Sequence, residues 1–435
     1  MEWWLTTLIV VLSLCGLLII GIPIAFGLGL LSIGVLLIYD GPSALTAIRY
    51  IPLGVLSSFV YVPIPLFVLM AELLIVSEIS RDLFDAVYDW VGRVHGGVAI
   101  ATILTGALIG AMCGISAAAV AILAVFCIDE FEKFKYRRTL TSGCIASTGA
   151  LAILIPPSVP MILYGGLAEQ SISSLFLAGI IPGLVLAGFF CLYAAAEGYV
   201  HRKDYKRPEK VAFSQKLTHL PKIGPALLVI MIVLGAIYAG YATATESAGL
   251  GCLAVFIISL VRRKMTLSAL KQALLRTVEI NCMICFILVC AMIFGHTITL
   301  LRIPQTVTEI IISAKLQGWL VIVSTQLLLF VLGCFLDIIS IILITTPLLY
   351  PIIVSYGYDP IWFGIMLIVN MEMAVLTPPV GLNLWVLAGI SKKYNFDLAR
   401  DIVPGIIPFL VMDLLLIVLL MIFPQLALWL PSRFK

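Results

Sequence analysis

The stretch ALAILIPPSVPMILYGG, residues 150–166, places three prolines inside a long apolar segment. A proline in a helix interior removes a backbone donor, and its ring clashes with the preceding turn. A continuous helix therefore cannot pass through Pro156 and Pro157. A second stretch far downstream, AVLTPPVGLNLWVLAGI at residues 374–390, repeats the pattern with Pro378 and Pro379. The sequence predicts two membrane-length helices that are broken in the same way.

Composition places these breaks in a membrane protein. Hydrophobic residues make up 62% of the 435 residues and charged residues 11%, whereas soluble domains are about 25% charged. The length suffices for roughly a dozen spans of about 20 residues each. The sequence contains no P-loop and no dinucleotide-binding glycine motif, which argues against ATP hydrolysis by this chain. We therefore expect an all-α polytopic membrane protein.

Twelve apolar segments are the candidate spans. Four of them exceed 30 residues, although a simple span needs only about 20. These four segments must therefore be broken or re-entrant. The twelve segments are 3–20, 22–39, 51–77, 96–127, 139–170, 174–198, 223–241, 246–261, 277–299, 319–354, 361–391 and 404–430.

Lys and Arg predict the orientation of the spans, because basic loops stay on the cytoplasmic side. Basic residues are concentrated in 128–138, 201–222, 262–276 and 391–400, which we assign to the cytoplasm. The segment 355–360 has no Lys or Arg and is expected to face outward. With these assignments, 96–127 begins and ends on the same side of the membrane.

The count of crossings predicts two halves of opposite orientation, joined by the basic cytoplasmic linker 201–222. In each half a re-entrant hairpin precedes a proline-broken crossing. Inverted repeats with interrupted helices are typical of secondary transporters. The first repeat, 1–200, comprises scaffold spans within 3–77, hairpin 96–127, broken helix 139–170 and span 174–198; the second, 223–435, comprises spans within 223–299, hairpin 319–354, broken helix 361–391 and span 404–430.

The spacing between glycine and proline supports the repeat. Gly110 precedes Pro156 by 46 residues, and Gly333 precedes Pro378 by 45. Small residues in the hairpins, including Gly114, permit close backbone approach and an unwound tip. We therefore expect the two hairpins and the two breaks to meet at one central site.

Each break offers two kinds of binding group side by side. The half-helix that ends there presents free carbonyls, and the half-helix that begins there presents free N–H groups. Such backbone must line a cavity or be buried in protein. Sodium suits the carbonyl oxygens and an organic carboxylate suits the N–H groups. The polar side chains available near the breaks are Ser147, Thr148, Ser158, Asn370, Thr377 and Asn383, and all of these except Thr377 are predicted to bind the substrate.

Ionisable residues inside membrane segments are functional candidates by default. Asp337 lies in the second hairpin, and Glu372 lies before the second double proline. We treat both as possible polar support for the site. Four other acidic residues are interpreted as structurally paired or interfacial: Glu72, Glu246, Glu279 and Asp413.

Three stretches resemble a known family. GALAILIPPSVPMILYG, LITTPLLYPIIVSYGYDPIWFGIMLIVNMEMAVLTPPVGLNLWVLAGI and GIPIAFGLGL are similar to the large, DctM-type membrane subunit of TRAP (tripartite ATP-independent periplasmic) transporters. The resemblance covers essentially the whole chain. It implies sodium-driven uptake of an organic acid, such as a dicarboxylate, across the bacterial inner membrane. It also implies two partners, a small four-helix membrane subunit and a periplasmic substrate-binding protein, and an elevator mechanism.

The resemblance further implies about two sodium sites, held mostly by backbone carbonyls at the hairpin tips and breaks. No organic cofactor and no nucleic-acid partner is expected. Ala374 stands where glycine is common in the family, and the first tip has one hydroxyl fewer, which backbone ligation tolerates. The implied ligands are Gly114, Ser116, Ala152, Ile153 and Ile155 for one site, and Gly333, Ala374, Thr377 and Val380 for the other.

Two other hypotheses about function remain besides the importer that depends on a binding protein. One is a stand-alone sodium- or proton-coupled carboxylate symporter or antiporter of related architecture. The other is a membrane enzyme or ion channel that uses the same polar gaps, although no catalytic cluster is visible in the sequence. We expect a secondary active transporter rather than an enzyme.

Overall fold

The computed structural model describes residues 9–10, 12–14, 16–17, 20–206, 216 and 220–434. The regular elements in this part of the chain are all helical. Seven of the described helices are long and apolar enough to cross a membrane. The all-α polytopic class predicted from the sequence is therefore confirmed. The predicted first span, 3–20, falls largely outside the described residues, as does most of the linker 201–222.

The four over-long segments are interrupted, as predicted. Segment 96–127 forms α6 (Gly97–Cys113) and α7 (Ser116–Lys133). Segment 319–354 forms α17 (Gly318–Gly333) and α18 (Ile338–Ser355). Each pair packs on itself around a short turn, which is the geometry of a hairpin. The side from which each hairpin enters the membrane stays a prediction.

The two proline-bearing segments break where the sequence places the prolines. Segment 139–170 forms α8 (Arg138–Leu151) and α9 (Val159–Leu167), with Ser158 capping α9 by accepting the N–H of Met161. The second such segment, 361–391, forms α19 (Pro360–Leu376) and α20 (Leu382–Ser391).

The remaining helices of the first part flank these elements. They are α2 (Ile24–Asp40), α3 (Ala44–Leu56), α4 (Pro63–Ser77), α5 (Ile79–Val91) and α10 (Ile172–Val200). The predicted span 51–77 is thus divided between α3 and α4. Pro63 opens α4, a position where its missing N–H has no intrahelical partner to lose.

In the second part the helices depart from the predicted bounds in two places. Helix α15 runs from Leu267 to Leu300 and takes up much of the predicted loop 262–276, because Thr266 caps it by accepting the N–H of Ala269. The predicted span 404–430 is divided at Pro424. The helices are α12 (Gly224–Ile230), α13 (Ala236–Tyr238), α14 (Ala244–Val261), α15, α16 (Ile303–Ser313), α21 (Val403–Ile422) and α22 (Gln425–Arg433).

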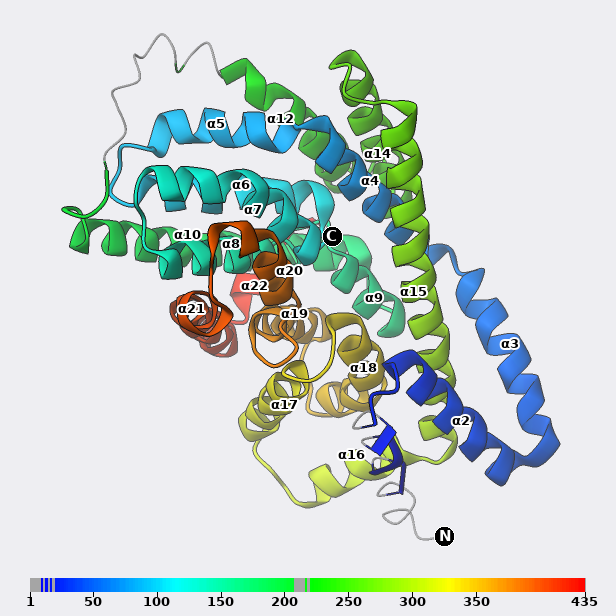
Figure 1. Ribbon diagram of the computed structural model, residues 1–435. Helices are drawn as coiled ribbons and strands as arrows, with labels where there is room; N and C mark the ends of the chain where they lie inside the picture. Colours follow the sequence, from blue (N-terminus) through cyan, green and yellow to red (C-terminus); the bar gives the residue numbers. More distant parts are fainter. Residues whose placement is uncertain are drawn as a thin grey trace.

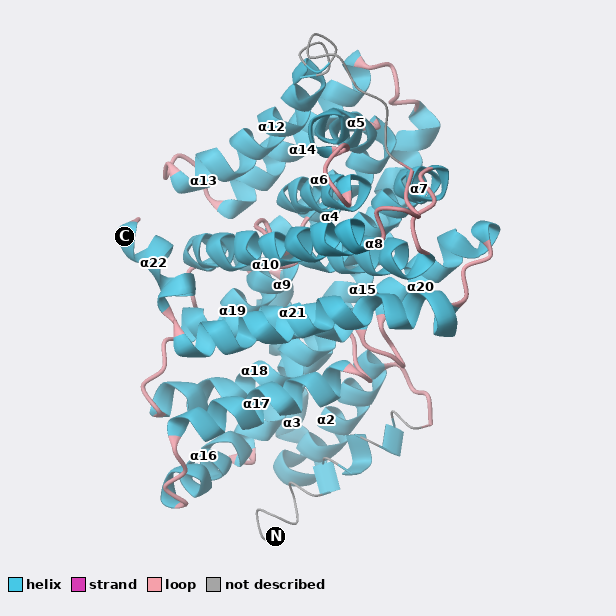
Figure 2. Cartoon of the chain, turned by 90° about the vertical axis from the view of Figure 1, so that its left-hand side faces the viewer, coloured by secondary structure: helices cyan, strands magenta, loops and turns pink. Residues whose placement is uncertain are grey.

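The arrangement puts the broken helices in the middle of the molecule. In Figure 2, α8, α9 and α10 lie beside α19 and α21 in a central layer, with α4–α7 and α12–α14 above and α2, α3 and α16–α18 below. Helix α15 runs along one side and packs against α2, α3, α4 and α18 (Figure 1). The second hairpin is therefore held against one long continuous helix through α18.

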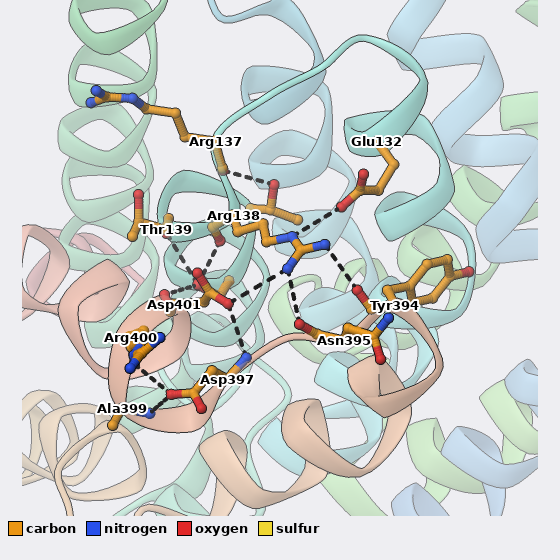
Figure 3. A network of polar contacts seen from close by, with 12 residues as sticks. Glu132, Arg137, Arg138, Thr139, Tyr394, Asn395, Asp397, Ala399, Arg400 and Asp401 are labelled. Atoms are coloured by element: carbon orange, nitrogen blue, oxygen red, sulfur yellow. Dashed lines mark hydrogen bonds and ion pairs between the residues drawn. The ribbon is translucent and has the colours of Figure 1, made fainter.

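An arginine joins the two halves at the start of the first broken helix (Figure 3). The Arg138 guanidinium donates to the carbonyls of Asn395 (2.9 Å) and Tyr394 (3.1 Å) in the segment after α20. It also lies 3.6 Å from Glu132 and 4.0 Å from Asp401. The exposed ion pairs contribute little, but the hydrogen bonds tie the segment 394–401 to the base of α8.

Candidate functional site

Around the two breaks, helices of one half pack against helices of the other half. The second helix of the first hairpin, α7, packs on α20, which follows the second break. In the same way α18, from the second hairpin, packs on α9, which follows the first break. Each hairpin is therefore seated against the broken helix of the other half.

A glycine and an alanine make the same contact in each half. A Cβ built on Gly110 would lie 2.8 Å from the Cα of Ala152, and one built on Gly333 would lie 2.7 Å from the Cβ of Ala374. Both alanines stand four residues before the first proline of a double proline. The matched glycine–proline spacing in the sequence thus corresponds to one packing contact that occurs twice.

The first hairpin tip also touches the first break directly. Gly114 has a φ of +64°, and a Cβ there would lie 2.2 Å from the carbonyl oxygen of Pro157. Its own carbonyl accepts the N–H of Val159 at 3.4 Å. In the second half the N–H of Val380 donates to the carbonyl of Cys334 at 3.2 Å. The backbone of each hairpin tip is therefore hydrogen-bonded to the backbone of the break in the same half.

A cavity of about 430 Å³ lies where these parts converge. Its wall combines both hairpin tips, both breaks and one face of α15. Within the described chain, Asp337 is its one ionisable side chain; the rest of the wall is largely apolar. The residues that line it include Gly114, Ser116, Ile153, Val159, Met283, Ile284, Asp337, Ala374, Val375, Val380 and Leu382.

Four helices begin at this cavity. Residues at or next to the first positions of α7, α9, α18 and α20 line it. Helix N-termini carry partial positive charge and free N–H groups. Side chains cap α9 through Ser158 and α18 through Asp337, whereas the described structure gives α7 and α20 no side-chain cap. The cavity can therefore accept an anion without a basic side chain.

Backbone carbonyls at the breaks supply the complementary charge. The carbonyls of Ile153 and Val375 would be bonded in a continuous helix by residues 157 and 379, which are prolines without an N–H. Ile153 accepts the Ser158 hydroxyl instead, at 2.5 Å. Both residues line the cavity. Carbonyl oxygens and helix N-termini are thus adjacent, as the double prolines predict.

The implied sodium ligands divide into two groups. Five line the cavity and four lie behind it. Among the four, Ala152 and Gly333 make the glycine–alanine contacts, and the Thr377 hydroxyl bonds to the carbonyl of Met373 at 2.7 Å. Their role as ligands stays a prediction. The five in the wall are Gly114, Ser116, Ile153, Ala374 and Val380; the four behind are Ala152, Ile155, Gly333 and Thr377.

One of the predicted substrate residues joins the two halves. The Asn383 side chain donates from Nδ2 to the carbonyl of Ala146 (3.1 Å) and accepts the hydroxyl of Ser116 at Oδ1 (2.5 Å). Asn383 is fully buried. It therefore positions the cavity residue Ser116 from behind the wall.

The other predicted substrate residues lie away from the described cavity wall. Asn370 donates to Gln326 of α17, at 2.9 Å to its carbonyl and 3.0 Å to its side chain. Ser158 caps α9. Ser147 and Thr148 are buried in α8, and neither hydroxyl has a partner in the described part of the chain. A contact with substrate stays a prediction for all of them.

The two acidic candidates occupy different places. Asp337 lines the cavity, and its carboxylate accepts the N–H of Ser340 at 3.2 Å and also the Ser340 hydroxyl. Glu372 is 1% exposed in α19 and does not line the described cavity. Asp337 thus shapes the hairpin tip, while Glu372 belongs to a different part of the core.

The α15 side of the cavity was missed by the sequence reasoning. Ile280, Met283, Ile284 and Ile287 follow the helical spacing of one face and close the cavity opposite the hairpins. In the sequence they are ordinary apolar residues of a span. No local signal distinguishes an apolar face that lines a cavity from one that faces lipid.

Helical hairpins and broken helices that meet at a central cavity are typical of membrane transporters. Residues 11–426 match the family described as tripartite ATP-independent periplasmic transporter, DctM component. The chain is 31% identical to the C4-dicarboxylate TRAP transporter large permease protein DctM of Rhodobacter capsulatus, over 98% of this chain and 99% of that protein. It belongs to the DctM family of TRAP transporters and is a multi-pass protein of the bacterial inner membrane.

Two further comparisons bear on the assembly and the fold. The chain is 30% identical to the isethionate TRAP transporter permease protein DctMQ of Oleidesulfovibrio alaskensis, over 89% of this chain and 61% of that protein. The fold is similar to that of the YdaH transporter of Alcanivorax borkumensis, with a TM-score of 0.58 at 14% identity, over 88% of this chain and 89% of that one.

Proposed function

We propose that this permease subunit takes up a small organic acid, driven by a sodium gradient. The observation that carries the proposal is the cavity at which four helices begin and two prolines deprive the lining carbonyls of Ile153 and Val375 of their helical N–H partners. The N–H groups would hold the carboxylate, since basic side chains are absent from the described wall. Carbonyls next to them would hold sodium. The apolar remainder of the wall suits the hydrocarbon part of the substrate.

The proposed mechanism is of the elevator type. The hairpins α6–α7 and α17–α18, with the broken helices α8–α9 and α19–α20, would move together past α15. Their mutual packing across the halves supports movement as one unit. The cavity lies at the boundary between this unit and α15, where such a movement would carry a bound substrate across.

Partners are proposed from the family. The named relative DctMQ, of which this chain matches 61%, is consistent with a second membrane component attached to the large subunit. We propose a small four-helix membrane subunit and a periplasmic substrate-binding protein as partners. The proposed substrate class follows that of the similar proteins, which include C4-dicarboxylate and isethionate transporters.

Reconstitution tests this function. In proteoliposomes we expect uptake of the acid only when the small subunit, the substrate-loaded binding protein and an inward sodium gradient are all present. The binding protein's own ligand, identified by thermal-shift screening, serves as the transported probe. Full-rate transport by this chain alone would favour the stand-alone symporter. Uptake that persists without sodium would contradict sodium coupling.

The α15 wall offers a second test. Ile284→Trp would place a larger side chain in the cavity wall and take space from the substrate. We expect initial uptake to fall by about 10-fold, which corresponds to a loss of about 1.4 kcal/mol of substrate binding, with assembly of the subunits unchanged. Val278→Trp, at a position of the same helix that is exposed outside the cavity, is the matched control and should transport normally. Equal rates for both variants would remove α15 from the substrate site.

A further inference from the structure

A small pocket lies outside the transport cavity, where the turn between α5 and α6 meets the C-terminal end of α10 (Figure 1). Three exposed Lys and Arg side chains line it: Arg93 from the turn, and Arg202 and Lys206 from the segment after α10. No Asp or Glu is among the described residues of its wall. The pocket therefore concentrates positive charge at one end of the helices.

This positive charge is not neutralised by carboxylates of the described chain. None of the three basic side chains forms an ion pair there. Glu197 on α10 is engaged by other groups, since it lies 3.6 Å from Arg137 and 3.0 Å from His201. The Arg202 guanidinium lies 5.1 Å from the ring of Tyr199, a contact that orients it without neutralising its charge. The pocket is therefore suited to an anion.

Close backbone packing fixes the shape of the pocket. Gly96 has a φ of +74°, and a Cβ there would lie 2.0 Å from the carbonyl oxygen of Ala194. Helix α6 begins directly after Gly96 and has no side-chain cap. Tyr205 in the wall is 8% exposed, and its hydroxyl has no hydrogen-bond partner among the described residues. Free N–H groups at a helix start and an unpaired hydroxyl both suit the oxygens of an anion.

The size of the pocket restricts which anion it can hold. Its volume is about 20 Å³, and about 10–15 Å³ is enough for one water-sized group. One or two oxygens of a phosphate group fit, whereas a nucleotide or a whole metabolite does not. A free phosphate would have only this shallow contact. A lipid phosphate, by contrast, is also held in place by its own chains in the membrane.

Apolar and aromatic side chains lie next to the basic groups. Val94 is 52% exposed, Tyr199 57% and Val200 71%. Aromatic rings beside Lys and Arg are typical of the membrane–water interface. The basic segments 128–138 and 201–222, which we assign to the cytoplasm, meet at this end of the molecule, and anionic lipids attract such basic clusters. Acyl chains can lie along the exposed apolar side chains while the phosphate reaches the pocket.

We propose that this pocket binds the phosphate group of an anionic phospholipid on the cytoplasmic side of the membrane. Arg93, Arg202 and Lys206 donate to the phosphate oxygens, and the planar guanidinium groups suit that geometry. The pocket lies at the first residues of α6, whereas the transport cavity begins at Gly114, beyond the last residue of this helix. The inference is therefore independent of the proposed sodium and substrate sites.

Native mass spectrometry of the purified full-length chain tests the site. Phosphatidylglycerol is titrated onto protein in lipid-free detergent. We expect Arg93→Gln/Arg202→Gln to weaken the tightest binding event by about 25-fold, since each basic side chain near a membrane surface contributes about five-fold. Lys135→Gln/Lys203→Gln also removes two exposed charges, but from outside the pocket, and should bind like the wild type. Unchanged binding in the pocket variant, or an equal loss in the control, overturns the proposal.

Three further measurements establish the chemistry and the source of the ligand. Arg93→Lys/Arg202→Lys keeps the charge and should keep most of the affinity; a loss as large as that of the glutamine variant contradicts a charge-based site. Phosphatidylcholine has the phosphate without net charge and should bind more weakly than phosphatidylglycerol. Inorganic phosphate should not displace the lipid. Equal binding of the two lipids, or displacement by inorganic phosphate, overturns the assignment to an anionic phospholipid.

Discussion

Gly114→Ala should abolish uptake. The residue has a φ of +64°, which costs an L-amino acid about 1–2 kcal/mol. The added Cβ would also lie 2.2 Å from the carbonyl oxygen of Pro157, so the hairpin tip would have to separate from the first break. We expect transport at background level in proteoliposomes, with the subunits still assembled.

Gly357→Ala is the matched control, because it separates the effect of backbone strain from that of the clash with Pro157. Gly357 has a φ of +76°, but a Cβ there meets nothing within 4 Å. Gly357→Ala should therefore show the backbone strain alone and keep most of its transport. If the two variants lose activity equally, the contact between the tip and the break is not what the permease requires.

Asn383→Leu should reduce transport by about 10- to 100-fold. Leucine has a similar size but would leave the Ser116 hydroxyl and the Ala146 carbonyl without their present partner. Each buried polar group left unpaired costs about 1–3 kcal/mol. The contact joins α20 of the second half to α7 and α8 of the first, so its loss should loosen the two halves at the cavity. Initial uptake rates measure the effect.

A coupled variant and a control make this test specific. Asn281→Leu on α15 removes an amide that donates only to a carbonyl of its own helix, and it should have a much smaller effect. Ser116→Ala combined with Asn383→Leu should cost less than the sum of the single variants, because each removes the same contact. Additive losses would show that the two side chains act independently.

Each hairpin packs against the broken helix of the other half, and this packing limits how the hairpins can move. Neither hairpin can shift without displacing the other half's α9 or α20. Arg138 reinforces this link away from the cavity through the carbonyls of Tyr394 and Asn395. The proposed moving unit is therefore a single packed body, and the apolar face of α15 is the surface past which it would slide.

The helix breaks could be predicted from the sequence because their cause is local. Two adjacent prolines remove two helical N–H donors in succession, so Pro156 and Pro378 mark the ends of α8 and α19 within a few residues, whereas single prolines such as Pro182 stay inside their helices. Segment length against membrane thickness predicted the interruption of the two hairpins. The break at Pro424 and the division between α3 and α4 were missed because hydropathy continues across both.

Only the tertiary structure decided which side chains meet. Asn383 was predicted to bind substrate, which stays a prediction, and only the packed structure shows its amide bonded to Ser116 and Ala146. The isoleucines of α15 form the far wall, although apolar packing leaves no mark in a sequence of spans. Backbone chemistry acts over a few residues and can be read along the chain, whereas a cavity exists only after distant helices have packed.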